Sequence, residues 1–288
     1  MRGFMRVLIL GVSGMLGNTV FRRLSADDRY EVFGSARSAS VRRSFDASIS
    51  GNIHTGIDVE NFDSLAMLLA KVQPDAVINC IGLVKQLAES EDPLQAIPIN
   101  SLLPHRLARL CQIAGARLVH ISTDCVFAGD KGNYLETDAS DAQDLYGRSK
   151  YLGEVDYPHA VTLRTSIIGH ELGSTNGLVG WFLAQENSVK GYTKAIFSGL
   201  PTIELADVIG NVVLPDSSLS GLYQVASQPI AKFDLLTLVA KQYKKSIEIV
   251  PDDKLTIDRS LNAGKFEAAT GYVAPSWPEL VDKMFNFK

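Results

Sequence analysis

The chain has 288 residues, of which 46% are hydrophobic, and its formal net charge at pH 7 is −4. This composition suits a globular protein of one large domain or two unequal ones, and the acidic balance without a long basic block argues against a nucleic-acid-binding protein. No apolar run is long enough to cross a membrane and Arg6–Leu10 is too short for a signal peptide, so we expect a cytoplasmic protein that does not bind membranes.

A glycine-rich turn joins the first predicted strand to the first predicted helix. Arg6–Leu10 is a short apolar run, and Asn18–Leu24 has the pattern of a helix. The glycines between them leave backbone N–H groups accessible to a pyrophosphate, as in dinucleotide-binding proteins. An ordinary strand-to-helix turn is the alternative. In this turn the residues expected at a cofactor are Gly11, Ser13, Gly14, Met15, Leu16 and Gly17.

Two later segments concern the rest of the cofactor. Arg37 follows the predicted second strand, Tyr30–Ser35, where an acidic residue would favour NAD(H). Because arginine suits a 2′-phosphate, we favour NADP(H), with NAD(H) and a merely solvated arginine as alternatives. Gly56–Val59 could end a third strand, with Asp58 accepting from the adenine and Val59 against its ring. Asp58 as the cap of the following helix is the alternative.

The next elements alternate between helix and strand. Helices are predicted at Leu65–Val72 and Ile99–Ala114, and strands at Asp75–Cys80 and Arg117–Ser122. This order indicates a doubly wound parallel sheet that binds ligands at the carboxyl ends of its strands. The glycine turn lies at such an end, and so do Cys80, Ile81, Gly82, Ser122 and Thr123.

Tyr146 and Lys150 carry the chemistry expected of a reductase. They are four residues apart and share one face if the segment is helical. An ammonium beside a phenol lowers the phenol pKa, which would make Tyr146 a general acid near neutral pH. Thr123, from a neighbouring strand end, could hold the substrate oxygen. A solvated surface pair is the alternative.

The cysteines and histidines indicate no metal site. Cys80, Cys111 and Cys125 are scattered and odd in number, which is typical of reduced thiols in a cytosolic protein. No Cys/His cluster has the spacing of metal ligands, so we expect no metal.

These motifs together resemble the extended short-chain dehydrogenase/reductases, and within them the dTDP-4-dehydrorhamnose reductase family. Besides the glycine turn, the resemblance is carried by Ile121–Phe127, Tyr134–Asp138, Tyr146–Glu154 and Leu163–Ser166. It implies an α/β fold: a Rossmann-like, doubly wound parallel sheet with a smaller α+β C-terminal substrate-binding domain. It also implies an NADP(H)-dependent reductase of a nucleotide-linked 4-keto-6-deoxysugar, which serves the synthesis of surface polysaccharide.

The resemblance assigns the roles in the reaction. Tyr146 would protonate the forming alkoxide, Lys150 would lower the Tyr146 pKa and bond the nicotinamide ribose, and Thr123 would hold the carbonyl oxygen. Ser122 would point to the opposite face of its strand. Asp124 would order the loop. Asn100 stands in the helix where related enzymes often carry an asparagine, and a structural hydrogen bond within the fold is the alternative role.

Three departures from the family lie toward the sugar. Cys125 replaces the usual tyrosine, Ile167 replaces a tryptophan, and 85–87 stand where an Asp-Lys pair is expected. A UDP-linked amino-deoxy hexose is therefore as plausible a substrate as dTDP-4-dehydrorhamnose. The residues expected at the substrate are Thr123, Ile167 and Arg259, with Lys194 and Lys265 as weaker candidates.

The second half is expected to cover the nucleotide sugar. The predicted elements are a helix at Asn176–Gln185, an amphipathic helix at Ile203–Val213, a strand at Gly221–Val225 and a capped helix at Asp234–Tyr243. Trp181 is expected to pack in the core, with stacking as the alternative. The predicted dinucleotide-binding domain is 1–168 with a segment near 203–226, and the nucleotide-sugar-binding domain is 169–202 and 227–288.

Two other functions remain open. An epimerase or dehydratase of the same fold would recycle its cofactor, although the Asp-Glu pair of a dehydratase is absent. A non-catalytic, NADP-binding regulatory relative is the other alternative, and the intact Thr123, Tyr146 and Lys150 count against it. The sequence leaves a homodimer open.

Overall fold

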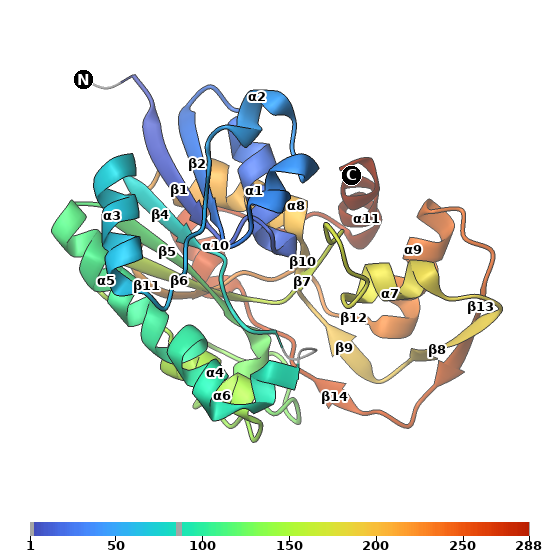
Figure 1. Ribbon diagram of the computed structural model, residues 1–288. Helices are drawn as coiled ribbons and strands as arrows, with labels where there is room; N and C mark the ends of the chain where they lie inside the picture. Colours follow the sequence, from blue (N-terminus) through green and yellow to red (C-terminus); the bar gives the residue numbers. More distant parts are fainter. Residues whose placement is uncertain (1–2, 85–87, 288) are drawn as a thin grey trace.

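The computed structural model describes residues 3–84 and 88–287, and one parallel seven-stranded sheet dominates it (Figure 1). The strand order is β11-β6-β5-β4-β1-β2-β3: the chain adds β2 and β3 on one side of β1 and the later strands on the other. Doubly wound folds bind ligands in the crevice at this switch point, between β1 and β4. The predicted fold class is confirmed. The strands are β1 (Met5–Leu10), β2 (Tyr30–Ala36), β3 (Ile53–Thr55), β4 (Ala76–Asn79), β5 (Arg117–Thr123), β6 (Ala160–Thr165) and β11 (Gly221–Gln224).

Helices cover both faces of this sheet, because the apolar side chains of β1 point alternately to one face and the other. Val7 and Ile9 belong to one core, together with side chains of α1 (Met15–Ser25) and α8 (Thr202–Val208). Leu8 and Leu10 belong to a second core, because successive side chains of a strand point to opposite faces. That core includes α3 (Phe62–Val72) and α5 (Leu103–Ala114).

A smaller part of the chain lies beside the carboxyl ends of the strands (Figure 1). It shares a core with the first face of the sheet, through residues such as Phe182 and Leu235. The predicted division into two domains, with boundaries near residues 168, 203 and 226, stays a prediction. The elements of the smaller part are α7 (Leu178–Ala184), β8 (Ser188–Tyr192), β9 (Ala195–Phe197), β12 (Ile230–Ala231), α9 (Lys232–Gln242), β13 (Glu248–Asp252) and β14 (Ile257–Asp258). Of the last two helices, α10 (Gly264–Thr270) lies against β11 of the large sheet and α11 (Trp277–Asn286) packs against α8 and α9 (Figure 1).

Short elements complete the chain, and several of them surround α6 (Leu145–Leu152), the helix of Tyr146 and Lys150. One of these is the π-helix η3 (Ile97–Leu102), which packs against α6 and leads into α5. The remaining elements are η1 (Ala39–Ser44), α2 (Ala47–Ser50), η2 (Ala88–Glu91), α4 (Pro93–Ala96), η4 (Asp124–Val126), β7 (Ile167–Ile168), β10 (Leu200–Pro201) and η5 (Ile209–Val213).

Three local predictions are wrong. Gly56–Val59 does not end the third strand, because β3 stops at Thr55 and Gly56 turns the chain with φ of 77°. The helix predicted from Asp234 starts two residues earlier, and Ala231 at its N-cap offers no side-chain cap. Trp181 is 39% exposed on α7, so it does not pack in the core. Among the described residues, no helix is both long and apolar enough to span a bilayer.

Candidate active site

The glycine turn presents the start of α1 to the crevice. Gly11 has φ of 87°, and a Cβ on Gly17 would lie 2.1 Å from the Gly11 carbonyl oxygen, so helix and turn can pack this closely only with glycine at 17. Gly14 is the N-cap of α1 and provides no side-chain cap, which leaves first-turn N–H groups for an anion. Ser13 and Gly14 are exposed at the tip, while Met15 is half-buried and Leu16 is buried.

The chain leaving β4 lies against this turn. A Cβ on Gly11 would come within 2.8 Å of Ile81 Cγ1, and the Ile81 N–H donates to Asn79 Oδ1 at 3.1 Å. A side chain at Gly82 would begin 3.6 Å from Lys150 Nζ. Glycine at 82 therefore adds no side chain beside the lysine, in the cradle that the turn and this segment form. Burial raises the pKa of the Cys80 thiol to about 12 and keeps it protonated.

Tyr146 and Thr123 are brought together by two different elements. Asp144 caps α6 by accepting from the Gly147 N–H at 2.7 Å, and Tyr146 lies in the first turn. Its phenol lies beside the side chain of Thr123, the last residue of β5, which acts to lower the Tyr146 pKa. Thr123 Oγ1 also donates to Asp124 Oδ1 and accepts from the Cys125 N–H, both at 3.1 Å. The threonine hydroxyl is therefore held in a fixed orientation.

Lys150 is buried one helical turn from Tyr146, but its ammonium bonds elsewhere. Its side chain is 5% exposed, and Nζ donates to the Ile121 carbonyl at 2.7 Å. Burial lowers the Lys150 pKa to about 8. Burial raises the Tyr146 pKa above its ordinary value, with Cys125 and Asp124 adding to the effect. The predicted lowering of the Tyr146 pKa by Lys150 is therefore wrong for this state, and Tyr146 is a neutral phenol at pH 7.

The residues predicted at the adenosine end are at the surface beyond β2 and β3. Arg37 is exposed directly after β2. Asp58 is exposed and accepts from the Glu60 N–H at 3.0 Å, while Val59 packs against the second core. The cap of α3 is Asn61, so the alternative role of Asp58 as that cap is wrong.

Arg259 reaches the loop Asp124–Phe127, which follows β5. Its Nε donates to the Phe127 carbonyl at 2.7 Å, and Nη1 lies 3.9 Å from Cys125 Sγ. The buried Asp124 carboxyl has a raised pKa, which the positive charge of Arg259 opposes. Arg259 therefore places a guanidinium beside the loop that follows Thr123. Ile167, in β7, is half-buried.

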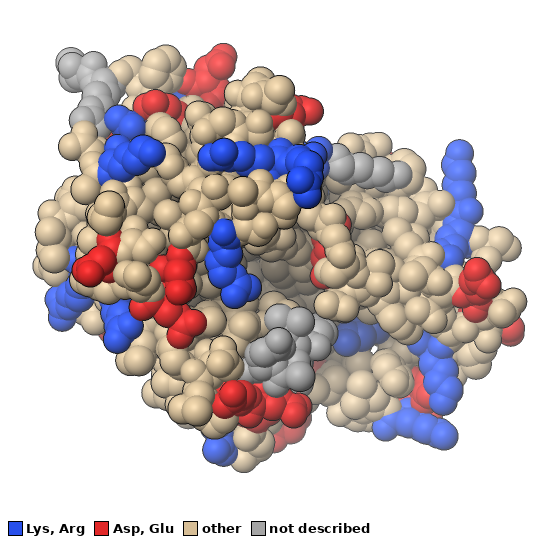
Figure 2. Space-filling model, in the orientation of Figure 1, with Lys and Arg blue, Asp and Glu red and all other residues tan. Residues whose placement is uncertain are grey.

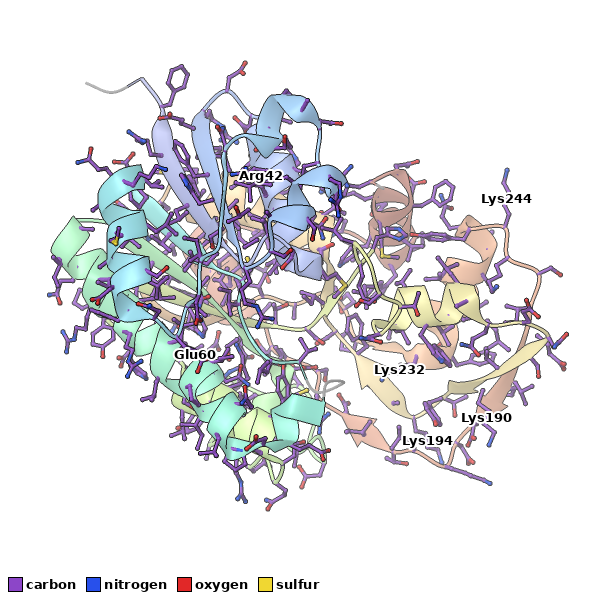
Figure 3. All side chains as sticks on the ribbon, viewed as in Figure 1. Arg42, Glu60, Lys190, Lys194, Lys232 and Lys244 are labelled. Atoms are coloured by element: carbon purple, nitrogen blue, oxygen red, sulfur yellow. The ribbon has the colours of Figure 1, made fainter. Side chains whose placement is uncertain are left out.

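The two weaker cation candidates have other partners. Lys194 pairs with Asp253 at 3.3 Å, and Figure 3 shows it on the smaller part of the molecule near Lys190. Lys265 donates to the Leu222 carbonyl at 2.6 Å and lies over the Tyr223 ring. The substituted positions 85–87 lie outside the described residues. In the space-filling view the face between the sheet and the smaller part is hollowed (Figure 2).

Sequence reasoning missed several buried polar residues around this site. His120 bonds Asn79 side chain to side chain at 3.1 Å, and Glu154 pairs with Arg164. Asn100 has the structural role, because its amide bonds the backbone of Leu83. Ser122 points away from Thr123, as predicted, toward Glu154. Within 3–84 and 88–287, no group of three or more His, Cys, Asp or Glu side chains is arranged to hold a metal.

Comparisons with known proteins agree with this geometry. A family model described as "RmlD substrate binding domain" matches residues 5–286. A Haloferax volcanii protein named probable low-salt glycan biosynthesis reductase Agl14 is 30% identical over 235 residues, covering 78% of this chain and 75% of that protein. The Escherichia coli K12 dTDP-4-dehydrorhamnose reductase is 28% identical over 255 residues, covering 80% and 85%. The Bacillus anthracis dTDP-4-dehydrorhamnose reductase, solved in complex with NADP, shares the fold with a TM-score of 0.80 at 22% identity, covering 98% of both chains.

Proposed function

We propose, because the chain belongs to the RmlD family of dTDP-4-dehydrorhamnose reductases, that it reduces the 4-keto group of a nucleotide-linked 6-deoxysugar with NADP(H). The neighbouring side chains of Thr123 and Tyr146 carry this proposal, since they lie at the carboxyl end of β5 with Lys150 one turn further along α6. The product would serve the synthesis of a surface polysaccharide. That product is a nucleotide-linked deoxysugar, and the nucleotide is dTDP or UDP.

The residues divide the work of such a reduction. The nicotinamide supplies the hydride when it is bound. Thr123 and Tyr146 present two hydroxyl groups to the same substrate oxygen, and Tyr146, as a neutral phenol, donates the proton that the forming alkoxide requires. The ammonium of Lys150, which donates to the Ile121 carbonyl, has the Gly82 side of the cradle open for the nicotinamide ribose. Arg259 orients the anionic part of the substrate.

Two features support NADP(H) as the cofactor, the glycine turn and Arg37. Gly11, Gly14 and Gly17 leave the start of α1 accessible to a pyrophosphate. Arg37 is exposed at the end of β2, where a 2′-phosphate would approach. The Bacillus anthracis protein of the same fold was solved with NADP, which supports NADP(H) here as well.

Consumption of cofactor distinguishes the reductase from an epimerase or a dehydratase. The assay follows NADPH absorbance with a panel of dTDP- and UDP-linked 4-keto-6-deoxysugars. A reductase oxidises one NADPH for each sugar reduced, whereas an enzyme that recycles its cofactor converts sugar without net oxidation. Conversion of sugar without NADPH loss would reject the proposed reaction.

Tyr146→Phe tests the proton donor. Removing the hydroxyl should lower kcat on the order of a thousandfold, because general acid catalysis contributes about 10² to 10⁴ in rate. The NADPH dissociation constant should stay near the wild-type value, since the ring remains in place. Tyr151→Phe is the matched control, because Tyr151 is on the same helix and 45% exposed. Retained turnover in the Tyr146 variant would refute the mechanism.

A further inference from the structure

Glu154 is the meeting point of three elements around the active site. It directly follows the C-cap of α6, Gly153. Its Oε1 accepts from Ser122 Oγ at 2.7 Å and from Arg164 Nε at 2.9 Å, while its Oε2 accepts from Arg164 Nη2 at 2.6 Å. The side chains are nearly shielded from water, with 9% of Glu154 and 2% of Arg164 exposed. This is a bidentate, charge-assisted pair with a third donor.

The partners of Glu154 are adjacent to the reacting groups in the sheet. Ser122 pairs in register with Arg164, and Thr123 with Thr165, across β5 and β6. The carboxylate therefore bonds the two strands one residue before each of them ends. Arg164 also lies over the Phe127 ring, 4.9 Å from its centroid, and so supports the loop that follows Thr123.

The end of α6 is tightly confined, which fixes where Glu154 begins. A Cβ on Gly153 would lie 1.9 Å from the Asn100 carbonyl oxygen, so α6 presses against η3 at this point. Through Ser122 and Arg164, Glu154 ties this end of α6 to the ends of β5 and β6. This tie supports the geometry between Tyr146 on the helix and Thr123 on the strand.

We propose that Glu154 is a positioning residue, which holds the catalytic helix and its lysine in register with the threonine strand through Ser122 and Arg164. This inference rests on the proposed reductase function for its kinetic readout. It assigns Glu154 no contact with substrate or cofactor. Its charge also acts on the lysine one turn earlier, so the position and the protonation of Lys150 depend on the same carboxylate.

The charge effect has a definite sign. Burial lowers the Lys150 pKa to about 8, and the negative charge of Glu154 raises it against that trend. Removing the charge should lower the Lys150 pKa further, so the ammonium would be lost at a lower pH. Besides Glu154, the titratable groups that act on Lys150 or feel its charge are Cys80 from the end of β4 and the buried, neutral His120 from β5.

Glu154→Gln tests both effects in the full-length protein. The amide keeps the shape but loses the charge, so kcat should fall about tenfold, because small displacements of reacting groups cost 10 to 100 in rate. The alkaline limb of the pH–rate profile should move down by about one pH unit. NADPH affinity should change less than about twofold, since the cradle is untouched. Glu186→Gln, at an exposed position in the smaller part, is the matched control.

A direct titration separates this inference from the proposed reaction. The ¹³Cε signal of Lys150, assigned by loss in Lys150→Arg, should titrate near 8 in the wild type and lower in Glu154→Gln. This readout needs no substrate, so it stands even if every 4-keto sugar fails as a substrate. An unmoved titration together with an unchanged kcat would overturn the inference.

If Glu154→Gln does not fold, Ser122→Ala tests the positioning role in its place. It removes one donor and no charge, so the protein should fold, kcat should fall several-fold and the Lys150 titration should stay in place. A wild-type kcat in Ser122→Ala would overturn the positioning role.

Discussion

Arg37 is the residue on which the choice between NADP(H) and NAD(H) depends. Its guanidinium is exposed directly after β2, and its carbonyl accepts from the Gly56 N–H at 3.0 Å, which fixes its backbone at the end of the sheet. The nearby Arg42 is already used, because it donates to the Ile53 carbonyl at 2.6 and 3.1 Å. Of these two arginines, Arg37 is therefore the one whose side chain can turn to a phosphate on the adenosine ribose.

Arg37→Asp should weaken NADPH binding about 10- to 100-fold, because a charge-assisted hydrogen bond to phosphate is replaced by like-charge repulsion. NADH binding should change little or improve. Fluorescence titration of both cofactors measures the two dissociation constants. Arg43→Asp makes the same charge change on the exposed η1 helix and should leave both constants near wild type. Unchanged NADPH affinity in Arg37→Asp would exclude the assigned role.

At the scale of elements, the glycine turn shows how one missing side chain determines a packing distance. A methyl group at Gly17 would meet the carbonyl oxygen of Gly11 at 2.1 Å, and that atom belongs to backbone that cannot rotate away. Gly17→Ala should therefore lower the free energy of unfolding by ~3 kcal/mol and abolish NADPH binding. Urea denaturation measures the first effect and cofactor fluorescence the second.

Gly51→Ala is the control for this prediction. Gly51 has helical φ and ψ of −63° and −27°, and no atom lies within 4 Å of an added Cβ. Its unfolding free energy should equal that of the wild type or rise slightly. If Gly17→Ala behaved like this control, α1 would not depend on the close approach seen in the structure.

The elements that could be predicted are those whose signal is local. The apolar run of β1, the glycine turn and the periodic helices α3 and α5 each follow from residues close together in sequence. The π-helix η3 was not predicted, because its geometry depends on packing against α6. The exposure of Trp181 was also missed, since the period of a short apolar helix does not reveal which side faces the crevice.

The same division holds for the candidate site. The spacing of Tyr146 and Lys150 and the strand end at Thr123 are visible in the sequence, so these residues could be selected. Their electrostatics could not, because burial raises the Tyr146 pKa and lowers that of Lys150, and burial is a property of the folded molecule. The Glu154 network was missed because its partners are separated by 10 and 32 residues.

At the scale of the whole molecule, an ionic network joins the last helix to the face of the sheet. Lys283 of α11 lies 2.5 Å from both Glu204 and Asp207 of α8. Asp207 also pairs with Arg23 of α1 at 2.6 Å, and Glu204 accepts from Tyr272 Oη at 2.8 Å. Three helices far apart in sequence are thus tied together on the face that carries the glycine turn.

Lys283→Met should destabilise the protein because it leaves two carboxylates of α8 close together, with Glu204 only 6% exposed. Breaking a buried pair costs about 3–5 kcal/mol, and since the Lys283 side chain is 35% exposed we expect ~2 kcal/mol. Urea denaturation at pH 7 measures this loss. Lys190→Met is the matched control: its partner is Asp252, its side chain is 66% exposed, and it projects from the edge of the smaller part (Figure 3). That variant should show no measurable change, and an equal loss in both would mean that the network adds nothing beyond a surface pair.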